Sequence, residues 1–179
     1  IGFVGRLVPE KGVLDLLEAF VPLAGRAHLI LVGTGPLQEL ILQRAAEAGI
    51  TEWVRLVGFV PYQEVPAYLR GLDVLVLPSR TIPWWQEQFG HVLAEAMLAG
   101  VPVVGSDSGA IPEVIGEAGL IFPEGDIAAL RERLARLGEH PKERERLAVA
   151  GRQRALAHFT AQAIGRQTLA FYRQVMEAS

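Results

Sequence analysis

Short apolar runs alternate with longer helical patterns along the first 125 residues, and this alternation restricts the chain to few folds. The runs are apolar throughout rather than at every second position, as is typical of strands covered on both faces of a parallel sheet. The predicted strands are residues 1–5, 28–33, 54–57, 74–77, 101–105 and 119–122, and the predicted helices are 13–24, 37–48, 62–71, 90–99 and 111–115. We therefore expect an α/β, Rossmann-like parallel sheet of about six strands flanked by helices.

The remaining residues, 126–179, continue without a strand pattern, and we expect helices that pack on the sheet domain of residues 1–125. Breaks at His140-Pro141 and near Thr160 predict two or three helices in this tail. Glu and Arg interleave from about residue 131 to 154, a pattern typical of a solvated helix surface.

Composition excludes several classes of protein and site. A net charge of -3 argues against a nucleic-acid-binding protein, and the absence of cysteine excludes disulfides, thiolate metal sites and cysteine nucleophiles. No apolar run reaches the ~18 residues that span a bilayer, and no signal-peptide pattern is present, so we expect a cytoplasmic location. The chain begins without Met in a strand-like run, IGFVG, and we expect it to be a piece of a longer polypeptide.

Ligands bind to parallel sheets at the carboxyl ends of the strands, so the loops there form the candidate site. The first such loop, GRLVPEKG, carries Arg6 and Lys11, two cations suited to a polyanion such as a diphosphate, although both could be ordinary surface residues. In the second, GTGPLQEL, Gln38 replaces the third glycine of the dinucleotide fingerprint, which favours a simple turn into a helix and disfavours a dehydrogenase. The loops considered are residues 5–12, 33–36, 58–63, 78–90 and 105–112.

Two carboxylates flank an FG pair in the segment EQFGHVLAE. A helix that begins near Phe89 leaves the backbone N–H groups around residues 90–92 available to an anion. Glu87, just upstream, could contact a ligand or simply complement the helix dipole. Glu95 has apolar neighbours on the same helix face and needs a partner, either a protein donor or a ligand hydroxyl. Eight residues of helix span ~12 Å, so the two carboxylates could contact opposite ends of one elongated ligand.

Other motifs of phosphate and metal chemistry are missing. The chain has no Walker A pattern and no Asp-x-Asp pair, and its four histidines lack metal-ligand spacing, so we expect neither P-loop phosphoryl transfer nor a metal site. Trp84 and Trp85 follow Pro83 in a loop, where they could form a hydrophobic plug or a platform for a sugar or an acceptor. The sequence leaves both possibilities open.

The order of five motifs resembles a known family over residues 1–125: GRLVPEKG, VGTGP, VRLVGFVP, LDVLVLPS and EQFGHVLAEAMLAGVPVVGSDSGAIPEVI. It resembles the retaining nucleotide-sugar glycosyltransferases of GT-B architecture, family four (glycosyl transferases group 1). The resemblance implies two Rossmann-like domains across a cleft, of which this chain is the C-terminal, donor-binding one. It also implies a missing N-terminal acceptor domain, to which the last helix could cross and through which the protein could associate peripherally with a membrane.

The resemblance also implies roles for individual residues in carbohydrate biosynthesis. Arg6 and Lys11 would bind the donor diphosphate and stabilise it as the leaving group, while Glu87 would contact sugar hydroxyls and Glu95 the ribose hydroxyls. Transfer would proceed with retention and without a metal or another cofactor, the nucleotide diphosphate sugar being the donor substrate. The remaining implied contacts come from Gly58, Phe59 and Val60 at the nucleobase and from Phe89, Gly90, His91 and Val92 at the phosphate or sugar.

Two features differ from the usual family pattern: Gly109-Ala110 stands where Gly-Gly is frequent, and TIPWWQEQ makes the loop before Glu87 bulky. Two other functions remain open, a GT-B-shaped nucleotide-sugar epimerase and a non-catalytic nucleotide-binding module. We expect the isolated chain to bind nucleotide weakly and to be inactive in transfer, because the acceptor half is missing. The sequence specifies neither the donor base and sugar nor the acceptor.

Overall fold

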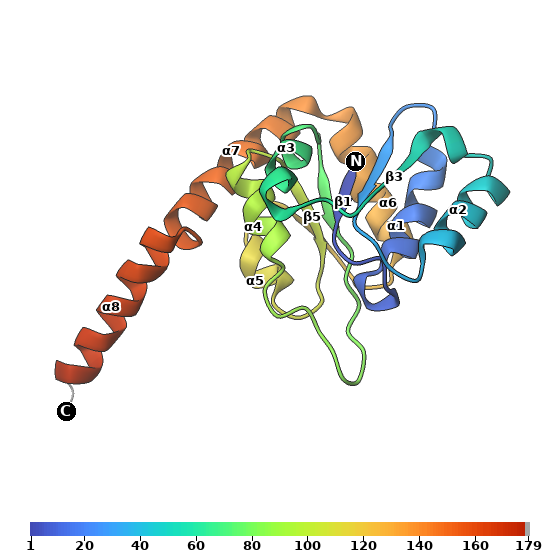
Figure 1. Cartoon of the computed structure of the whole chain (residues 1–179). Coiled ribbons are helices and arrows are strands. Elements are labelled where there is room, and N and C mark those ends of the chain that lie inside the picture. Colours follow the sequence, from blue (N-terminus) through green and yellow to red (C-terminus); the bar gives the residue numbers. More distant parts are fainter. Residues whose placement is uncertain (178–179) are drawn as a thin grey trace.

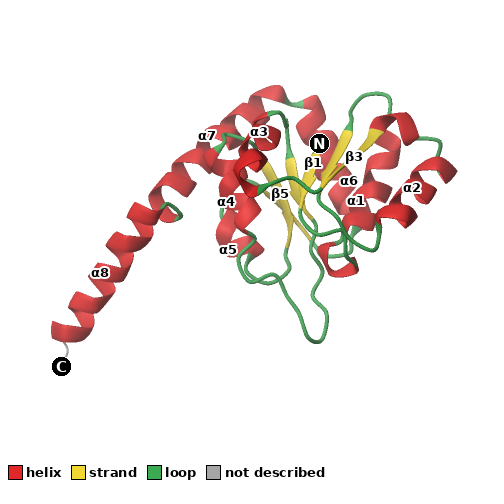
Figure 2. Cartoon of the chain, viewed as in Figure 1, coloured by secondary structure: helices red, strands yellow, loops and turns green. Residues whose placement is uncertain are grey.

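The computed structural model describes residues 1–177, which form one parallel sheet with helices on both faces (Figures 1 and 2). All six predicted strands are present, with ends that differ from the prediction by at most two residues. The order across the sheet is β3-β2-β1-β4-β5-β6, and each neighbouring pair is parallel. The strands are β1 (Gly2–Val4), β2 (Leu29–Val32), β3 (Val54–Gly58), β4 (Leu75–Leu77), β5 (Val103–Ser106) and β6 (Leu120–Phe122). The predicted α/β parallel-sheet fold is confirmed.

Alternating side chains along the strands build two hydrophobic cores, one on each face of the sheet. Phe3 and Val76 belong to the core that contains α1 (Val13–Phe20), α2 (Gln38–Glu47) and α6 (Ile127–Glu139). Leu75 and Leu77 belong to the opposite core, with α3 (Val65–Arg70), α4 (His91–Leu98) and α5 (Ile111–Ile115). Successive residues of a strand face opposite sides, so continuously apolar strands can support both layers.

The tail consists of three helices separated at the two predicted breaks. After α6, α7 (Pro141–His158) contributes Leu147 to one core and Ala155 to the other, so it crosses the end of the sheet. The side chain of Thr160 accepts a hydrogen bond from the Ala163 N–H at 3.2 Å, at the start of α8 (Ala161–Glu177). Whereas α6 and α7 share the cores of the sheet domain, α8 projects away from the body (Figure 1).

Prolines moved two of the predicted helix boundaries. The helix predicted at 13–24 ends earlier, and a 3-10 turn, Val21–Leu23, follows α1 because Pro22 has no N–H to continue the helix. The helix predicted at 62–71 starts as a 3-10 turn, Tyr62–Glu64, and Pro66 lies in the first turn of α3, where a missing N–H costs nothing. The expectation of burial on both faces was wrong for β3, which forms an edge of the sheet and exposes Arg55.

Candidate functional site

The candidate site lies where the strand order reverses, between β1 and β4. The chain leaves β1 toward α1 on one face and leaves β4 toward the opposite face, and such a switch point opens a crevice at the carboxyl ends of the strands. The two loops involved, residues 5–12 and 78–90, are in direct backbone contact. The Arg80 N–H donates to the Glu10 carbonyl at 2.8 Å, and a Cβ on Gly12 would lie 1.8 Å from the Pro78 carbonyl oxygen. Only glycine at position 12 therefore allows the loops to approach this closely.

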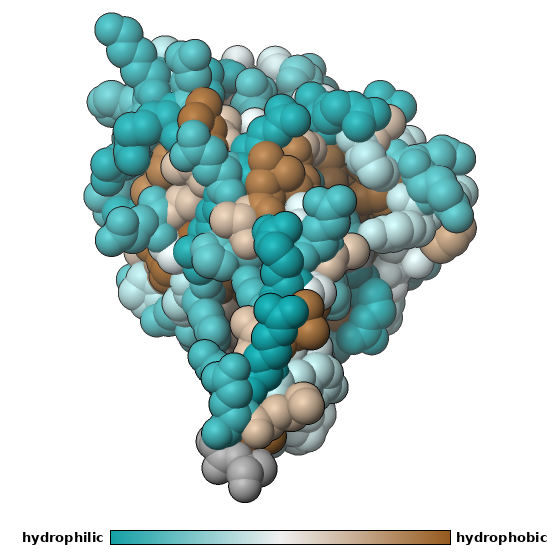
Figure 3. All heavy atoms as spheres, turned by 90° about the vertical axis from the view of Figure 1, so that its left-hand side faces the viewer, coloured by the Kyte–Doolittle hydropathy of each residue, from teal (hydrophilic) through white to brown (hydrophobic). Residues whose placement is uncertain are grey.

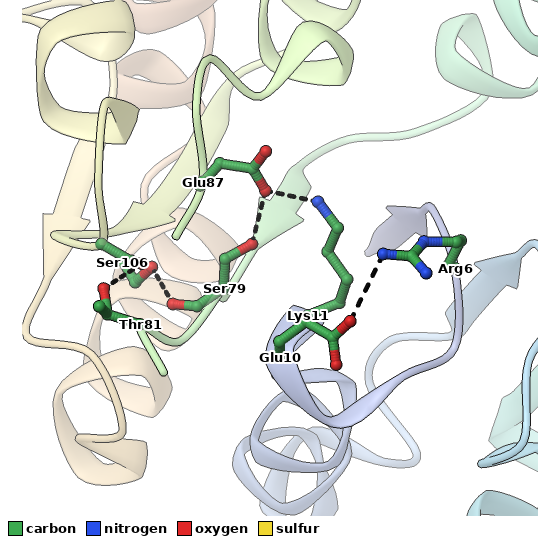
Figure 4. A network of polar contacts seen from close by, with 8 residues as sticks. Arg6, Glu10, Lys11, Ser79, Thr81, Glu87 and Ser106 are labelled. Carbon is green, nitrogen blue, oxygen red and sulfur yellow. Dashed lines mark hydrogen bonds and ion pairs between the residues drawn. The ribbon is translucent and has the colours of Figure 1, made fainter. Parts of the chain in front are cut away.

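The central contact of the site joins Lys11 to Glu87 (Figure 4). Lys11 Nζ donates to Glu87 Oε2 at 2.5 Å, and Ser79 Oγ donates to the same oxygen at 2.9 Å. The Lys11 side chain is 16% exposed and that of Glu87 is 9% exposed, so the ion pair is largely shielded from water. Within residues 1–177, Glu87 Oε1 has no protein donor and can still accept a hydrogen bond from a ligand.

An aromatic ring borders the other side of the Lys11 ammonium. Nζ lies 4.8 Å from the centroid of the Trp85 ring, within the ~6 Å range of cation–π contacts. Lys11 is thus fixed between a carboxylate and an indole. Its ammonium can donate three hydrogen bonds, of which one is used by Glu87. The other two donors remain for an anion without any loss of the ion pair.

The backbone of Glu87 is held by the loop after β5. The Ala110 N–H donates to the Glu87 carbonyl at 2.9 Å, and a Cβ on Gly109 would lie 2.1 Å from the same oxygen. Gly109 also has a φ of +54°, which favours glycine. The Gly109-Ala110 sequence therefore keeps the one glycine that the position of Glu87 requires.

Hydroxyl groups of three buried serines and of the exposed Thr81 link the loops beneath the ion pair. Ser106 Oγ donates to the Ser79 carbonyl at 2.6 Å, and the hydroxyls of Thr81 and Ser108 are 2.9 Å apart (Figure 4). These four residues were missed in the sequence. Hydroxyl residues at the carboxyl ends of apolar strands, as Ser79 near the end of β4 and Ser106 at the end of β5, are the signal that could have indicated two of them.

Arg6 and Lys11, predicted as a pair of cations, have separate partners in the structure. The Arg6 side chain is 64% exposed and contacts Glu10 at 3.4 Å. An exposed pair at this distance contributes little, so the Arg6 guanidinium can turn toward a ligand. Arg80, which was not predicted, is bound bidentately by Asp15, at 2.5 and 2.7 Å. It fastens the loop after β4 to α1.

The second predicted carboxylate, Glu95, lies half-buried on α4 and has a protein donor. Tyr62 donates its phenolic hydrogen to Glu95 Oε1 at 3.1 Å, and this bond raises the pKa of Tyr62 above its ordinary value. The helix begins at His91, as expected, with Gly90 at a φ of +73° as its N-cap. No side chain caps this end, so its first N–H groups face the switch-point crevice without a side-chain acceptor.

The other predicted binding residues lie in the loops around this centre. Gly58, with a φ of +84°, accepts a hydrogen bond from the Gly33 N–H at 2.8 Å and begins the loop in which Phe59 is 79% exposed. Val60 and Val92 pack against the core that contains α4. Phe89 is half-buried, with its ring perpendicular to that of Phe159, whereas His91 is exposed.

The glycines of the second loop have a structural role. A Cβ on Gly33 would lie 1.9 Å from the Gly5 carbonyl oxygen, and one on Gly35 would lie 2.3 Å from that of Leu7. The loop supports the first loop of the site, in agreement with the turn that Gln38 favoured. Separately, no group of three or more metal-ligating side chains occurs among residues 1–177. Of the helices in that same part of the chain, none has the length and apolarity needed to cross a bilayer.

Comparison with known proteins decides the family. Residues 1–154 match the family described as Glycosyl transferases group 1. The chain belongs to this family. It is 33% identical to the 2-deoxystreptamine glucosyltransferase of Streptomyces kanamyceticus, over 98% of this chain and 46% of that protein. It is 36% identical to the MMP alpha-(1->4)-mannosyltransferase of Mycolicibacterium hassiacum, over 94% of this chain and 41% of that protein. The chain thus spans about half the length of the curated relatives that it matches.

Solved structures share the fold over nearly the whole chain. Anabaena Alr3699/HepE in complex with UDP superposes with a TM-score of 0.86 at 24% identity, over 97% of this chain and 48% of that one. The C-terminal domain of a glycosyl transferase group 1 family protein (LpcC) from Francisella tularensis superposes with a TM-score of 0.81 at 24% identity, over 89% of this chain and 85% of that domain. The fold of this group 1 glycosyltransferase chain is therefore one half of a GT-B architecture.

Proposed function

We propose that this chain is the donor-binding half of an enzyme that transfers a sugar from a nucleotide diphosphate sugar to an acceptor, with retention and without a metal. The observation that carries the proposal is the shielded ion pair of Lys11 and Glu87 at the switch point, next to the uncapped N-terminus of α4. A cation and free backbone N–H groups at one edge of a parallel sheet suit a diphosphate. The Anabaena protein of the same fold is in complex with UDP, which supports a nucleotide as part of the donor.

The arrangement would stabilise the charge that develops on the leaving diphosphate. Lys11 keeps two donors for phosphate oxygens while it remains paired with Glu87, and its position is fixed before the ligand arrives. Such a preorganised charge needs no rearrangement during the reaction and can supply a large part of catalysis. Arg6, exposed at the same loop, would add a second cation once its contact with Glu10 is released.

The two carboxylates would hold the hydroxyl groups of the donor. Glu87 offers its free Oε1 to the transferred sugar, beside the diphosphate held by Lys11. Glu95 keeps Oε2 for the ribose, because Tyr62 binds only Oε1. The backbone around Phe59, at the exposed end of the loop that follows β3, would contact the nucleobase.

The acceptor would bind to an N-terminal half of the same polypeptide. The amphipathic helix α8 projects from the body and exposes apolar side chains that a free surface helix would not carry. Figure 3 views the molecule from this side, where apolar side chains interrupt a mostly hydrophilic surface. We place α8 against that N-terminal half, together with any peripheral membrane contact, and we propose a cytoplasmic location. The exposed apolar residues of α8 are Ile164, Leu169, Phe171, Tyr172, Val175 and Met176.

Calorimetric titration of the chain with UDP-, GDP- and ADP-sugars tests the donor site. The chain contains only two lysines, so Lys142→Ala, at an exposed position, is a matched control for Lys11→Ala. We expect one sugar nucleotide to bind and Lys11→Ala to weaken it about tenfold, the usual value of one charge-assisted contact, with no effect of Lys142→Ala. Failure of every sugar nucleotide to bind would refute the donor-site assignment.

Turnover of the complete polypeptide tests the catalytic role. Lys11→Ala should lower kcat by about 10²–10³, the loss that follows removal of one preorganised donor. Release of free nucleotide together with a glycosylated acceptor identifies a transferase, whereas an isomeric sugar nucleotide identifies an epimerase. Near-normal turnover of the Lys11→Ala enzyme would contradict the role given to this residue.

A further inference from the structure

The loop that leads to Glu87 ends in a tight turn that presents an indole ring to solvent. The Ile82 N–H donates to the Trp85 carbonyl at 2.9 Å, and the Trp85 N–H donates to the Ile82 carbonyl at 3.1 Å. These two bonds close the turn, and Trp84 at its tip is 82% exposed. The turn holds the Trp84 backbone away from the body, and the ring leaves most of its apolar surface to solvent.

The base of this turn is anchored to the next loop of the site. The Thr81 N–H donates to Glu124 Oε2 at 2.9 Å, and the Glu124 N–H donates to Asp107 Oδ1 at 2.7 Å. The Thr81 hydroxyl also bonds that of Ser108. A turn fixed at its base holds Trp84 in one place, so a ligand that stacks on the ring pays little ordering entropy.

The two neighbouring indoles face different environments. Trp85 covers the Lys11 ammonium at 4.8 Å and belongs to the centre that would hold the diphosphate. Trp84, the adjacent residue, points outward. Trp85 also lines a second surface beside this turn, so that surface adjoins the donor centre.

That second surface is a recess of about 690 Å³, a volume within the ~300–1,000 Å³ range of small-molecule sites. None of the residues that line it is cationic, so it suits a neutral ligand better than a phosphate. The side-chain amides of Gln86 and Gln88 both donate and accept hydrogen bonds, and the Glu124 carboxylate accepts them. These groups suit sugar hydroxyls, which also act as both donors and acceptors. The flat indole matches the C–H face of a sugar ring. The lining residues are Thr81, Ile82, Pro83, Trp84, Trp85, Gln86, Gln88 and Glu124.

We propose that this recess is a saccharide subsite on the acceptor side of the donor centre, with Trp84 as the stacking platform and Gln86, Gln88 and Glu124 as the groups that bind hydroxyls. The ligand class is a neutral glycan. Binding of a glycan in the recess does not depend on the proposed transferase function, but the identification of that glycan as the acceptor rests on it. Stacking that buries about 60 Å² of apolar surface corresponds to about a tenfold gain in affinity.

Nuclear magnetic resonance of the indole N–H groups tests this subsite, because the chain contains only three tryptophans. The probes are maltotriose and mannobiose, titrated to high millimolar concentration, and in a separate arm UDP, GDP and ADP. We expect a saccharide to shift the Trp84 signal and to leave unchanged the signal of Trp53, whose ring packs 5.0 Å from that of His28. Trp84→Ala should weaken saccharide binding about tenfold, whereas Leu42→Ala, which removes an exposed apolar side chain on α2, should not.

The two arms separate this inference from the proposed function. If neither saccharide moves the Trp84 signal while one of the nucleotides binds, the subsite is refuted and the donor site stands. If a saccharide binds and none of the three nucleotides does, the subsite stands and the donor site falls. A Trp84→Ala chain that binds saccharide normally but unfolds more easily would show that the indole is a structural plug, which also overturns the proposal.

Discussion

Replacing Lys11 by Met tests how strongly the structure depends on the ion pair at the switch point. Met has a similar length and no charge, so the change leaves Glu87 shielded from water with only the hydrogen bond from Ser79 Oγ. Loss of one partner from a buried ion pair costs ~3–5 kcal/mol. Because Ser79 still donates and some exposure remains, we expect the lower end, a loss of about 3 kcal/mol in the free energy of unfolding.

A double-mutant cycle with Glu87→Gln isolates the interaction. Lys11, the more exposed partner, can reach water when the carboxylate is neutralised, so Glu87→Gln should cost about 1.5 kcal/mol. The double variant should lose about 2.5 kcal/mol rather than the sum of the two, which gives a coupling of about 2 kcal/mol.

Urea unfolding of the four chains at neutral pH, followed by circular dichroism, measures these values. The midpoint of unfolding should shift while the slope stays constant, because the surface exposed on unfolding is the same. A coupling below ~0.5 kcal/mol, the range of independent sites, would show that Lys11 and Glu87 do not contact each other in solution.

Two further predictions concern the parts that surround this pair. Gly109→Ala should cost about 3 kcal/mol of unfolding free energy and weaken nucleotide binding, because the new Cβ meets the Glu87 carbonyl. Gly49→Ala, with a similar positive φ and open space, is the matched control and should cost about 1 kcal/mol; equal losses would contradict the role of the close contact. The bond to Glu95 raises the pKa of Tyr62, so its stabilising effect is complete below pH ~10 and lost as pH rises through the higher folded-state pKa. Titration of the Tyr62 ring by magnetic resonance should show a lower midpoint in Glu95→Gln, and an unchanged midpoint would exclude the bond.

Much of the fold could be predicted because its signals are local. Mostly apolar runs indicated each strand, and the breaks at His140-Pro141 and Thr160 correctly divided the tail. The errors came from single residues whose effect was overlooked. Pro22 ends α1 early, and Arg55 indicates that β3 is an edge strand. Neither error changes the layers of the fold.

The sequence offered candidate residues for the site but no contacts between them. Lys11 and Glu87 were both candidates, yet they are 76 residues apart, and nothing in the spacing shows that they meet. They meet because β1 and β4 are neighbours in the sheet. Arg6, which the sequence placed beside Lys11, has a separate partner instead. The positions of the loops in the folded sheet decide which charged side chains can contact each other.

The sequence by itself determined the α/β class, the helical tail, the loops of the candidate site and the chemical types of the side chains in these loops. Hydrophobic periodicity indicates which side chains are buried, and turn residues indicate where the backbone turns. Burial and turns along the chain are enough to define the fold class, the helical tail and the loops. The tertiary structure alone decided the strand order, the enclosure of Lys11 between Glu87 and Trp85, and the bond from Tyr62 to Glu95. These contacts depend on how the helices pack on the two faces of the sheet, because that packing brings distant loops together at a single edge.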